Sequence, residues 1–190
     1  MVHPCSMIAS TTFTQGDLLS IIGIIFLIIC SAFFSSSETA YSISNTLRLK
    51  SLAEEKAHGA RKAIYIAENF ERTLACILTF NNLVNIASTS IAAYLFAKYI
   101  TSPTIANLLN TVVLTIVILI FGEILPKARA KRNPEKTALS YSSIVYFLLK
   151  FGVIYYPFYW LQKITKRKKI ETESPTVTED ELESIIDTIL

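Results

Sequence analysis

The chain has 190 residues, of which 52% are hydrophobic and 17% charged, and its formal net charge is +3. An average soluble domain is about 25% charged, whereas this chain carries no charge at all in residues 18–34. The modest charge, with basic residues in short clusters beside apolar segments, argues against a nucleic-acid groove and favours a membrane protein.

Three apolar segments predict three transmembrane helices, at residues 18–41, 74–100 and 107–125. Each is long enough to cross a hydrocarbon core of about 30 Å, which takes roughly 20 helical residues, or more where the helix is tilted. The preceding tail, residues 1–17, contains no Lys or Arg, so the first segment lacks the basic start of a cleaved signal peptide. We therefore predict an all-α integral membrane protein.

Shorter elements are predicted beside the spans. Within residues 42–73, apolar residues at helical spacing predict two short amphipathic helices that lie along the membrane. These residues are Leu47, Leu49, Leu52 and Ala53, followed by Ala63, Ile64, Ile66 and Ala67. Residues 137–164 are apolar and rich in aromatic side chains but contain Gly152 and Pro157. We interpret them as a bent helix in, or re-entering, the cytoplasmic leaflet, with a plain fourth span as the alternative.

Basic residues cluster in 42–73, in 127–136 and in 163–169, whereas the N-terminal tail has none. Since Lys and Arg concentrate on the cytoplasmic side of a membrane, we predict an extracytoplasmic tail (1–17), a transmembrane domain (18–169) and a cytoplasmic C-terminus. Residues 170–190 turn acidic, and Thr178 with Glu181 has the pattern of a capping box. We expect a cytosolic helix there, leading to a soluble domain that this chain lacks.

Polar residues recur inside the predicted spans, where each is costly and is therefore a functional candidate. Two sets have the spacing i, i+4, i+7, which places their side chains on one helix face, and a third accompanies a proline. The sets are Ser31, Ser35 and Glu38; Asn81, Asn85 and Ser88; and Gly122, Glu123 and Pro126.

Structural roles remain open for these residues. Serines in membrane helices often bond the carbonyl four residues back, which is the favoured reading for Ser36 or Ser37 alone. Asparagines can join neighbouring helices without binding a ligand. Glu38 and Glu123 lie near the ends of predicted spans, where water can solvate them.

The chemistry of the combined set is that of a site for a hard cation. All of its groups bind through oxygen, which suits Mg²⁺, Ca²⁺ or Na⁺. The two histidines, His3 and His58, lie outside the predicted spans, and the three cysteines show no metal or redox spacing. This inventory argues against zinc and against a Ser–His or Cys–His catalytic set, so we predict that the chain is not an enzyme.

Three runs of the sequence resemble the transmembrane domain of the CNNM/CorC (cyclin M-like) magnesium transporters. They are FFSSSETA from Phe33, NNLVN from Asn81 and GEILPK from Gly122. The resemblance covers about residues 18–190. It implies a homodimer with three spans per protomer, a belt of juxtamembrane helices and an inward-facing acidic cavity that binds Mg²⁺. It also implies a following pair of nucleotide-binding CBS modules, which this chain lacks.

The same resemblance implies which residues hold the ion, although it leaves open which serine coordinates. The resemblance points to Ser31, Ser35, Ser37, Asn81, Asn85, Gly122 and Glu123, and the polar set of the first span adds Glu38 as a candidate. The implied function is Mg²⁺ transport, as efflux, with Na⁺ as a candidate coupling ion. The alternative is a membrane protein that senses Mg²⁺ and regulates another transporter. We expect the lipid bilayer and a second copy as partners, no nucleic acid, and nucleotide only through the missing domain.

A last expectation concerns the backbone of the third span. In an α-helix the N–H of residue 126 would bond the carbonyl of Gly122, but Pro126 has no N–H. The Gly122 carbonyl would then lack its helical partner at membrane depth, where an unsatisfied group is costly. Either a simple proline kink lets water or a neighbouring side chain satisfy this carbonyl, or the carbonyl is a ligand of the ion.

Overall fold

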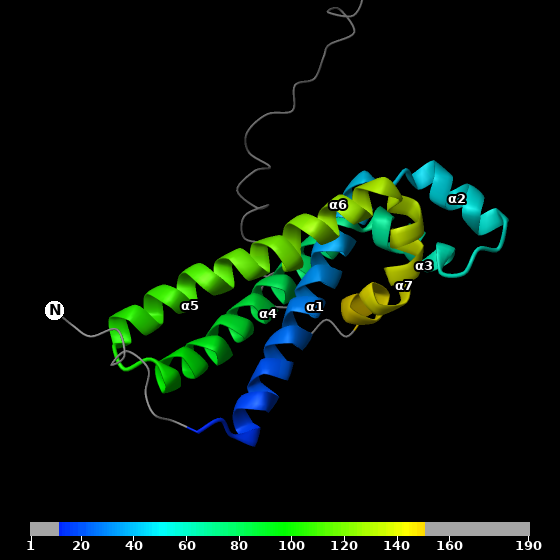
Figure 1. Cartoon of the computed structure of the whole chain (residues 1–190). Coiled ribbons are helices and arrows are strands. Elements are labelled where there is room, and N and C mark those ends of the chain that lie inside the picture. Colours follow the sequence, from blue (N-terminus) through cyan, green and yellow to red (C-terminus); the bar gives the residue numbers. More distant parts are fainter. Residues whose placement is uncertain (1–11, 151–190) are drawn as a thin grey trace, which may run out of the picture. The chain divides into compact units, whose positions relative to one another are not determined.

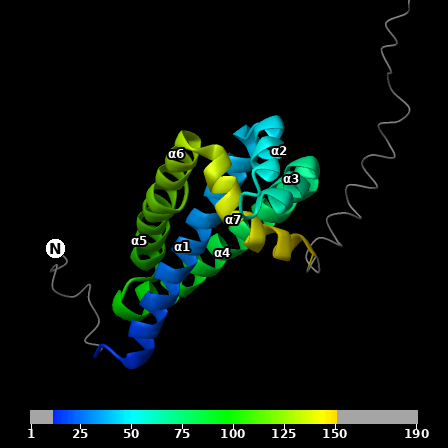
Figure 2. The same cartoon turned by 90° about the vertical axis from the view of Figure 1, so that its right-hand side faces the viewer.

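The computed structural model describes residues 12–150, and its elements are helices. Within this part of the chain, three helical rods are long and apolar enough to cross a membrane: α1 (Gln15–Ile43), α4 (Phe70–Tyr99) and the rod Pro103–Arg132. They lie side by side in Figures 1 and 2. The predicted all-α fold with three spans is therefore confirmed.

The third rod is continuous but not uniform. It consists of α5 (Pro103–Val117), a π-helical segment η2 (Ile118–Ile124) and α6 (Leu125–Arg132). It begins at Pro103, several residues before the predicted start, because proline at the first helical position loses no hydrogen bond that a helix would make.

The first span shows how the sequence suits a lipid environment. Its start is fixed by a capping box, in which the backbone N–H of Thr14 donates to the Asp17 carboxylate at 2.7 Å. Large apolar side chains such as Phe26 and Ile29 are 63% and 62% exposed. In a bilayer this surface faces lipid, so the buried face of α1 is free to carry polar residues.

The two predicted amphipathic helices are present as α2 (Thr46–Glu54) and α3 (Ala60–Glu68). Asn45 caps α2 by accepting a hydrogen bond from the N–H of Leu47 at 2.8 Å. Gly59, with φ of +81°, precedes α3. A side chain there would meet the Ser142 hydroxyl at 2.5 Å, so only glycine allows this close approach of the loop to α7.

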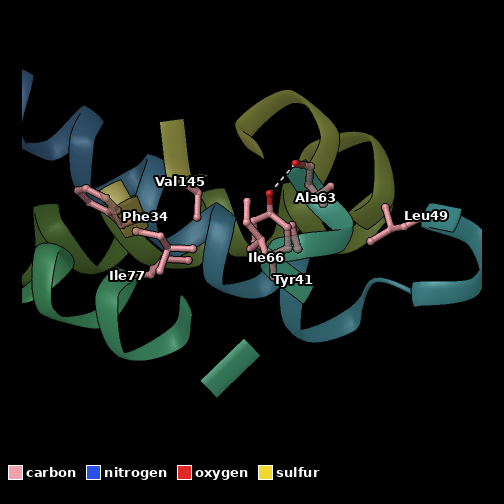
Figure 3. Close-up of a cluster of buried hydrophobic side chains, with 10 residues drawn as sticks. Phe34, Tyr41, Leu49, Ala63, Ile66, Ile77 and Val145 are labelled. Carbon is pink, nitrogen blue, oxygen red and sulfur yellow. Dashed lines mark hydrogen bonds between the residues drawn. The ribbon is translucent and has the colours of Figure 1, made fainter. Parts of the chain in front are cut away.

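An apolar cluster holds the short helices against one end of the spans (Figure 3). It joins Phe34 and Tyr41 of α1, Ile66 of α3, Ile77 of α4 and Val145 of α7 (Pro134–Lys150). The Tyr41 hydroxyl donates to the Ala138 carbonyl at 2.8 Å, which satisfies a buried polar group and ties α7 to α1. The polar half of α1 is thereby held in a fixed orientation.

Two predictions fall partly or wholly outside the described residues. Helix α7 covers the first part of residues 137–164, is not among the three candidate spans and packs against α1, α3 and α4. Residues 151–164 and the acidic helix expected in 170–190 lie beyond the described part. The bent helix and the fourth span therefore both remain predictions.

Candidate functional site

The predicted polar residues of α1 and α4 meet inside the protein. Ser31 and Asn81 are 0% and 7% exposed, and the Ser31 hydroxyl donates to the Asn81 side-chain oxygen at 3.0 Å. Both side chains therefore lie on the faces that the spacing predicted to be polar. This hydrogen bond joins the polar set of the first span to that of the second.

Gly122 brings the third span to the same place. It is buried, and a Cβ atom added to it would lie 2.9 Å from the Ser31 hydroxyl oxygen. Such a contact is too short for a real side chain, so the backbone of η2 approaches Ser31 this closely only because residue 122 is glycine. Ser31 is thus the point at which all three spans converge.

Two further candidate oxygens near this point have no hydrogen-bond partner within residues 12–150. They are the hydroxyl of Ser35, one turn along α1 from Ser31, and the side-chain oxygen of Asn85, one turn along α4 from Asn81. Buried polar groups normally have partners, and each exception calls for an explanation. A bound cation would supply one, because both oxygens carry lone pairs suited to a hard ion.

The backbone at Gly122 corrects one premise of the sequence analysis. The expectation assumed an α-helix, whereas η2 is a π-helix in which the N–H of Leu125 bonds the carbonyl of Ile120, five residues back. Because Pro126 has no N–H, the carbonyl of Phe121 lacks its hydrogen-bond donor in the π register. In an α register it would be the carbonyl of Gly122 that lacks one. The return to α-helix falls at this proline. Single π-helical segments within α-helices often accompany functional sites.

Two candidates beyond Ser35, Ser37 and Glu38, have partners of their own, as does the neighbouring Ser36. The Ser37 hydroxyl donates to the Phe33 carbonyl at 2.8 Å, which is the structural pattern that the sequence favoured for this residue. The Ser36 hydroxyl donates to the Pro126 carbonyl at 3.3 Å. Glu38 forms an ion pair with Lys127 at 3.1 Å. These last two contacts hold the first motif against the GEILPK motif.

Glu123 lies apart from the point of convergence. It is half-buried and lines a cavity of about 230 Å³ between α4 and the third rod, together with Thr89, Thr111 and Thr115. Ser31 and Asn81 are not among the residues that line this cavity. The structure therefore brings Ser31, Asn81 and Gly122 together but gives Glu123 a different polar neighbourhood.

Sequence reasoning missed one buried polar residue of the third span, Asn110. It is 6% exposed, and its side-chain oxygen has no partner within residues 12–150. The sequence could have identified it, because a polar residue among the apolar residues of a span is a candidate for a functional role. Asn110 was not identified because it lies outside the three motifs.

These features define a class of protein. Three apolar helical rods place the chain in a membrane, and they enclose hydroxyl, amide and backbone oxygens at the point where they converge. The family model described as "Cyclin M transmembrane N-terminal domain" matches residues 22–189. The chain belongs to this family, which confirms the resemblance seen in its motifs.

Curated bacterial proteins are similar over most of the chain. A UPF0053 protein of Haemophilus influenzae is 37% identical over 172 residues, which are 85% of this chain and 40% of that protein. The UPF0053 inner membrane protein YfjD of Escherichia coli is 29% identical over 164 residues, 82% of this chain and 37% of that protein. A UPF0053 protein of Mycoplasma pneumoniae is 28% identical over 183 residues, which are 92% of this chain and 42% of that protein. The chain thus spans about two fifths of the length of these relatives.

Proposed function

We propose that this chain is the membrane domain of a Mg²⁺ transporter and that the ion binds where the three spans converge. The observation that carries the proposal is the meeting of Ser31, Asn81 and Gly122 beside the unpartnered oxygens of Ser35 and Asn85. Membership of the cyclin M family supports the same reading.

The ligand chemistry favours a hard divalent ion. Hydroxyl, amide and carbonyl oxygens suit Mg²⁺, whereas softer metals favour thiolate or imidazole. Residues 12–150 contain no group of three or more His, Cys, Asp or Glu side chains placed to share a metal. In this proposal Ser31, Ser35, Asn81, Asn85 and the Gly122 carbonyl provide the oxygens. Mostly neutral ligands hold an ion less tightly than carboxylates do, which allows it to leave as well as to enter.

Glu38, Ser37 and Glu123 have weaker geometric support as ligands. Glu38 is already paired with Lys127, and the Ser37 hydroxyl with the Phe33 carbonyl. Glu123 would supply negative charge from the neighbouring cavity rather than from the point of convergence. A carboxylate at that position lowers the electrostatic cost of a cation at membrane depth.

The finer points of the proposal rest on the family. Efflux as the direction, Na⁺ as a coupling ion and a homodimer are proposed on that ground. The apolar faces of the second and third spans would lie near the dimer seam, because three spans alone have little bulk with which to enclose a polar cavity. The orientation with α2, α3 and α6 on the cytoplasmic side also has support from the positive-inside rule, because basic residues gather there. Light scattering in mild detergent tests the dimer, and a monomer would contradict it.

A membrane protein that senses Mg²⁺ and regulates another transporter is the second candidate. It would use the same oxygens, so binding experiments do not separate it from a transporter. Only the movement of Mg²⁺ by the purified chain does.

Binding is tested most directly by paired asparagine variants of α4. Asn85→Ala removes a buried, unpartnered oxygen, whereas Asn82→Ala removes an exposed side chain three residues earlier. If Asn85→Ala weakens binding tenfold, saturating Mg²⁺ stabilises it by about 1.4 kcal/mol less than the wild type. We expect that loss in thermal unfolding with and without Mg²⁺, and no loss in Asn82→Ala. An equal Mg²⁺ effect in all three proteins would remove Asn85 from the site.

A further inference from the structure

The helices α4 and α5 carry a second pair of buried oxygens. Ser88 of α4 and Asn110 of α5 are 1% and 6% exposed, and neither the Ser88 hydroxyl oxygen nor the Asn110 side-chain oxygen has a partner within residues 12–150. Both lie in the apolar part of a candidate span. Polar groups are costly there unless something binds them.

Ser88 continues the line of oxygens that begins at the proposed ion site. Asn81, Asn85 and Ser88 follow one another at i, i+4 and i+7, so they lie on one face of α4 and span about 10 Å along it. Asn81 is bonded to Ser31, while Asn85 and Ser88 have unpartnered oxygens. The line leads from the ion site toward the turn between α4 and α5.

Asn110 supplies the next position in this line from the neighbouring helix. Asn110 lies seven residues after Pro103, where α5 begins. Ala92 lies seven residues before Tyr99, where α4 ends. The two helices are packed together and joined by a short turn, so counting residues from that turn places Asn110 near the level of Ala92, one helical turn beyond Ser88. Figure 1 shows this turn at the end of the spans opposite to α2 and α3.

The burial pattern of α5 places Asn110 on the side of its neighbour. The buried residues of α5 are Ala106, Asn110 and Leu114, spaced four apart on one face. The neighbours against which α5 packs are α4 and η2. By residue position, Asn81, Asn85, Ser88 and Asn110 therefore follow one another at intervals of about 4.5–6 Å along the helix axis. A small cation held at 2.0–2.6 Å from its ligands, as Mg²⁺ or Ca²⁺ is, could pass between oxygens at that spacing.

We propose that Ser88 and Asn110 form a transit site for the cation, between the site at Ser31 and Asn81 and the end of the spans where α4 turns into α5. This inference rests on the proposed transport function. It adds two residues to the proposed pathway of the cation that are not among the ligands of the ion site. The part of this pathway between the ion site and the turn from α4 to α5 would run along the contact between these two helices. In the proposed orientation, this part leads to the extracytoplasmic side.

The competing explanation is that both residues only hold α4 and α5 together. Interhelical asparagines and serines do so by bonding across the contact, but neither of these oxygens has such a bond within residues 12–150. An oxygen without a partner does not join the two helices by a hydrogen bond, and its lone pairs are available to a cation. The two explanations predict different behaviour when an oxygen is removed.

The test compares Mg²⁺ flux and Mg²⁺ binding in matched variants of the chain. Asn110→Leu removes the buried oxygen while keeping a similar volume, and Asn107→Leu makes the same change at an exposed position of α5. Ser88→Ala is matched by Ser90→Ala, since Ser90 is exposed and bonded to the Ile86 carbonyl. Flux is measured in proteoliposomes with a Mg²⁺-sensitive dye, and binding by the Mg²⁺ dependence of thermal unfolding.

We expect Asn110→Leu to lower the maximal flux about tenfold and Ser88→Ala to lower it less, while the midpoint of Mg²⁺ binding changes by less than about twofold. Asn110→Asp, which keeps an oxygen at the same place, should retain more flux than Asn110→Leu. The two control variants should match the wild type.

Three results would overturn the inference. Wild-type flux in Asn110→Leu and Ser88→Ala would show that the ion does not pass these residues. Equal loss of flux, Mg²⁺ binding and thermal stability in both variants would assign them a structural role. A wild-type chain that binds Mg²⁺ without moving it would instead refute the transport function itself, and this inference with it. If Asn110→Leu fails to fold, Ser88→Ala, which removes one hydroxyl, decides the question.

Discussion

The Ser31 hydroxyl of α1 donates a hydrogen bond to the Asn81 side-chain oxygen of α4 at 3.0 Å, and both side chains are buried. These residues belong to different spans and are 50 positions apart in the chain. Their contact fixes the rotation of α1 against α4. The hydroxyl oxygen keeps both of its lone pairs and the amide oxygen keeps one, so each can still bind a cation.

Gly122 offers the sharpest steric test of this arrangement. In Gly122→Ala the new Cβ would lie 2.9 Å from the Ser31 oxygen. We expect the chain to lose about 1–3 kcal/mol of stability through overpacking and to lose Mg²⁺-dependent stabilisation. Gly23→Ala is the control, since its nearest neighbour would be Ile91 at 3.9 Å. Unchanged Mg²⁺ stabilisation in Gly122→Ala would place the ion elsewhere.

Pro126 tests the role of the backbone in η2. Pro126→Ala adds an N–H that faces the Phe121 carbonyl in the observed π register and the Gly122 carbonyl in an α register. Without the proline we expect the segment to shift to the α register, in which the Gly122 carbonyl is bonded and is a poorer ion ligand. Mg²⁺ binding should then weaken even though no side-chain ligand is lost. Titration calorimetry of the purified variant measures it. A wild-type affinity would leave the Gly122 carbonyl without support as a ligand.

We expect the ion pair between Glu38 and Lys127 to have a structural role, holding the FFSSSETA motif against the GEILPK motif. It is partly exposed, with side chains 23% and 36% accessible, so breaking it should cost about 0.2–1 kcal/mol. We expect Glu38→Gln and Lys127→Met to cost similar amounts and the double variant to cost no more than either. Glu38→Gln should bind Mg²⁺ like the wild type. Loss of Mg²⁺ binding in Glu38→Gln alone would instead make this carboxylate a ligand.

Asp17 joins the N-terminal end of α1 to the C-terminal end of α4. Its buried carboxylate accepts hydrogen bonds from Lys98 at 2.6 Å and from the Tyr99 hydroxyl at 2.7 Å. Asp17→Asn should lower the unfolding temperature by several degrees, because it leaves the Lys98 charge without its carboxylate partner. Glu68→Gln, which breaks the exposed pair of Lys50 and Glu68, should lower it little. Equal shifts in the two variants would show that the Asp17 cluster contributes no special stability.

Much of this structure follows from patterns in the sequence. Apolar length gave the three spans, and helical spacing gave α2, α3 and the shared face of Ser31 and Ser35. The π-helix was not predictable, because its register depends on how η2 packs against α1 at Gly122 and not on local preference alone. The partner of Glu38 was not predictable either, since it depends on the rotation of α6 about its own axis. Asn110 lay outside every motif.

Measurement of Mg²⁺ flux by the purified chain in proteoliposomes decides whether Mg²⁺ passes through the site at Ser31 and Asn81. We predict that the wild type moves Mg²⁺ down an imposed gradient, that Asn81→Ala abolishes this movement and that Asn82→Ala, at an exposed position, retains it. Mg²⁺ binding without any flux from the wild-type chain would contradict the claim and identify a sensor. Equal flux from Asn81→Ala and the wild type would contradict the site.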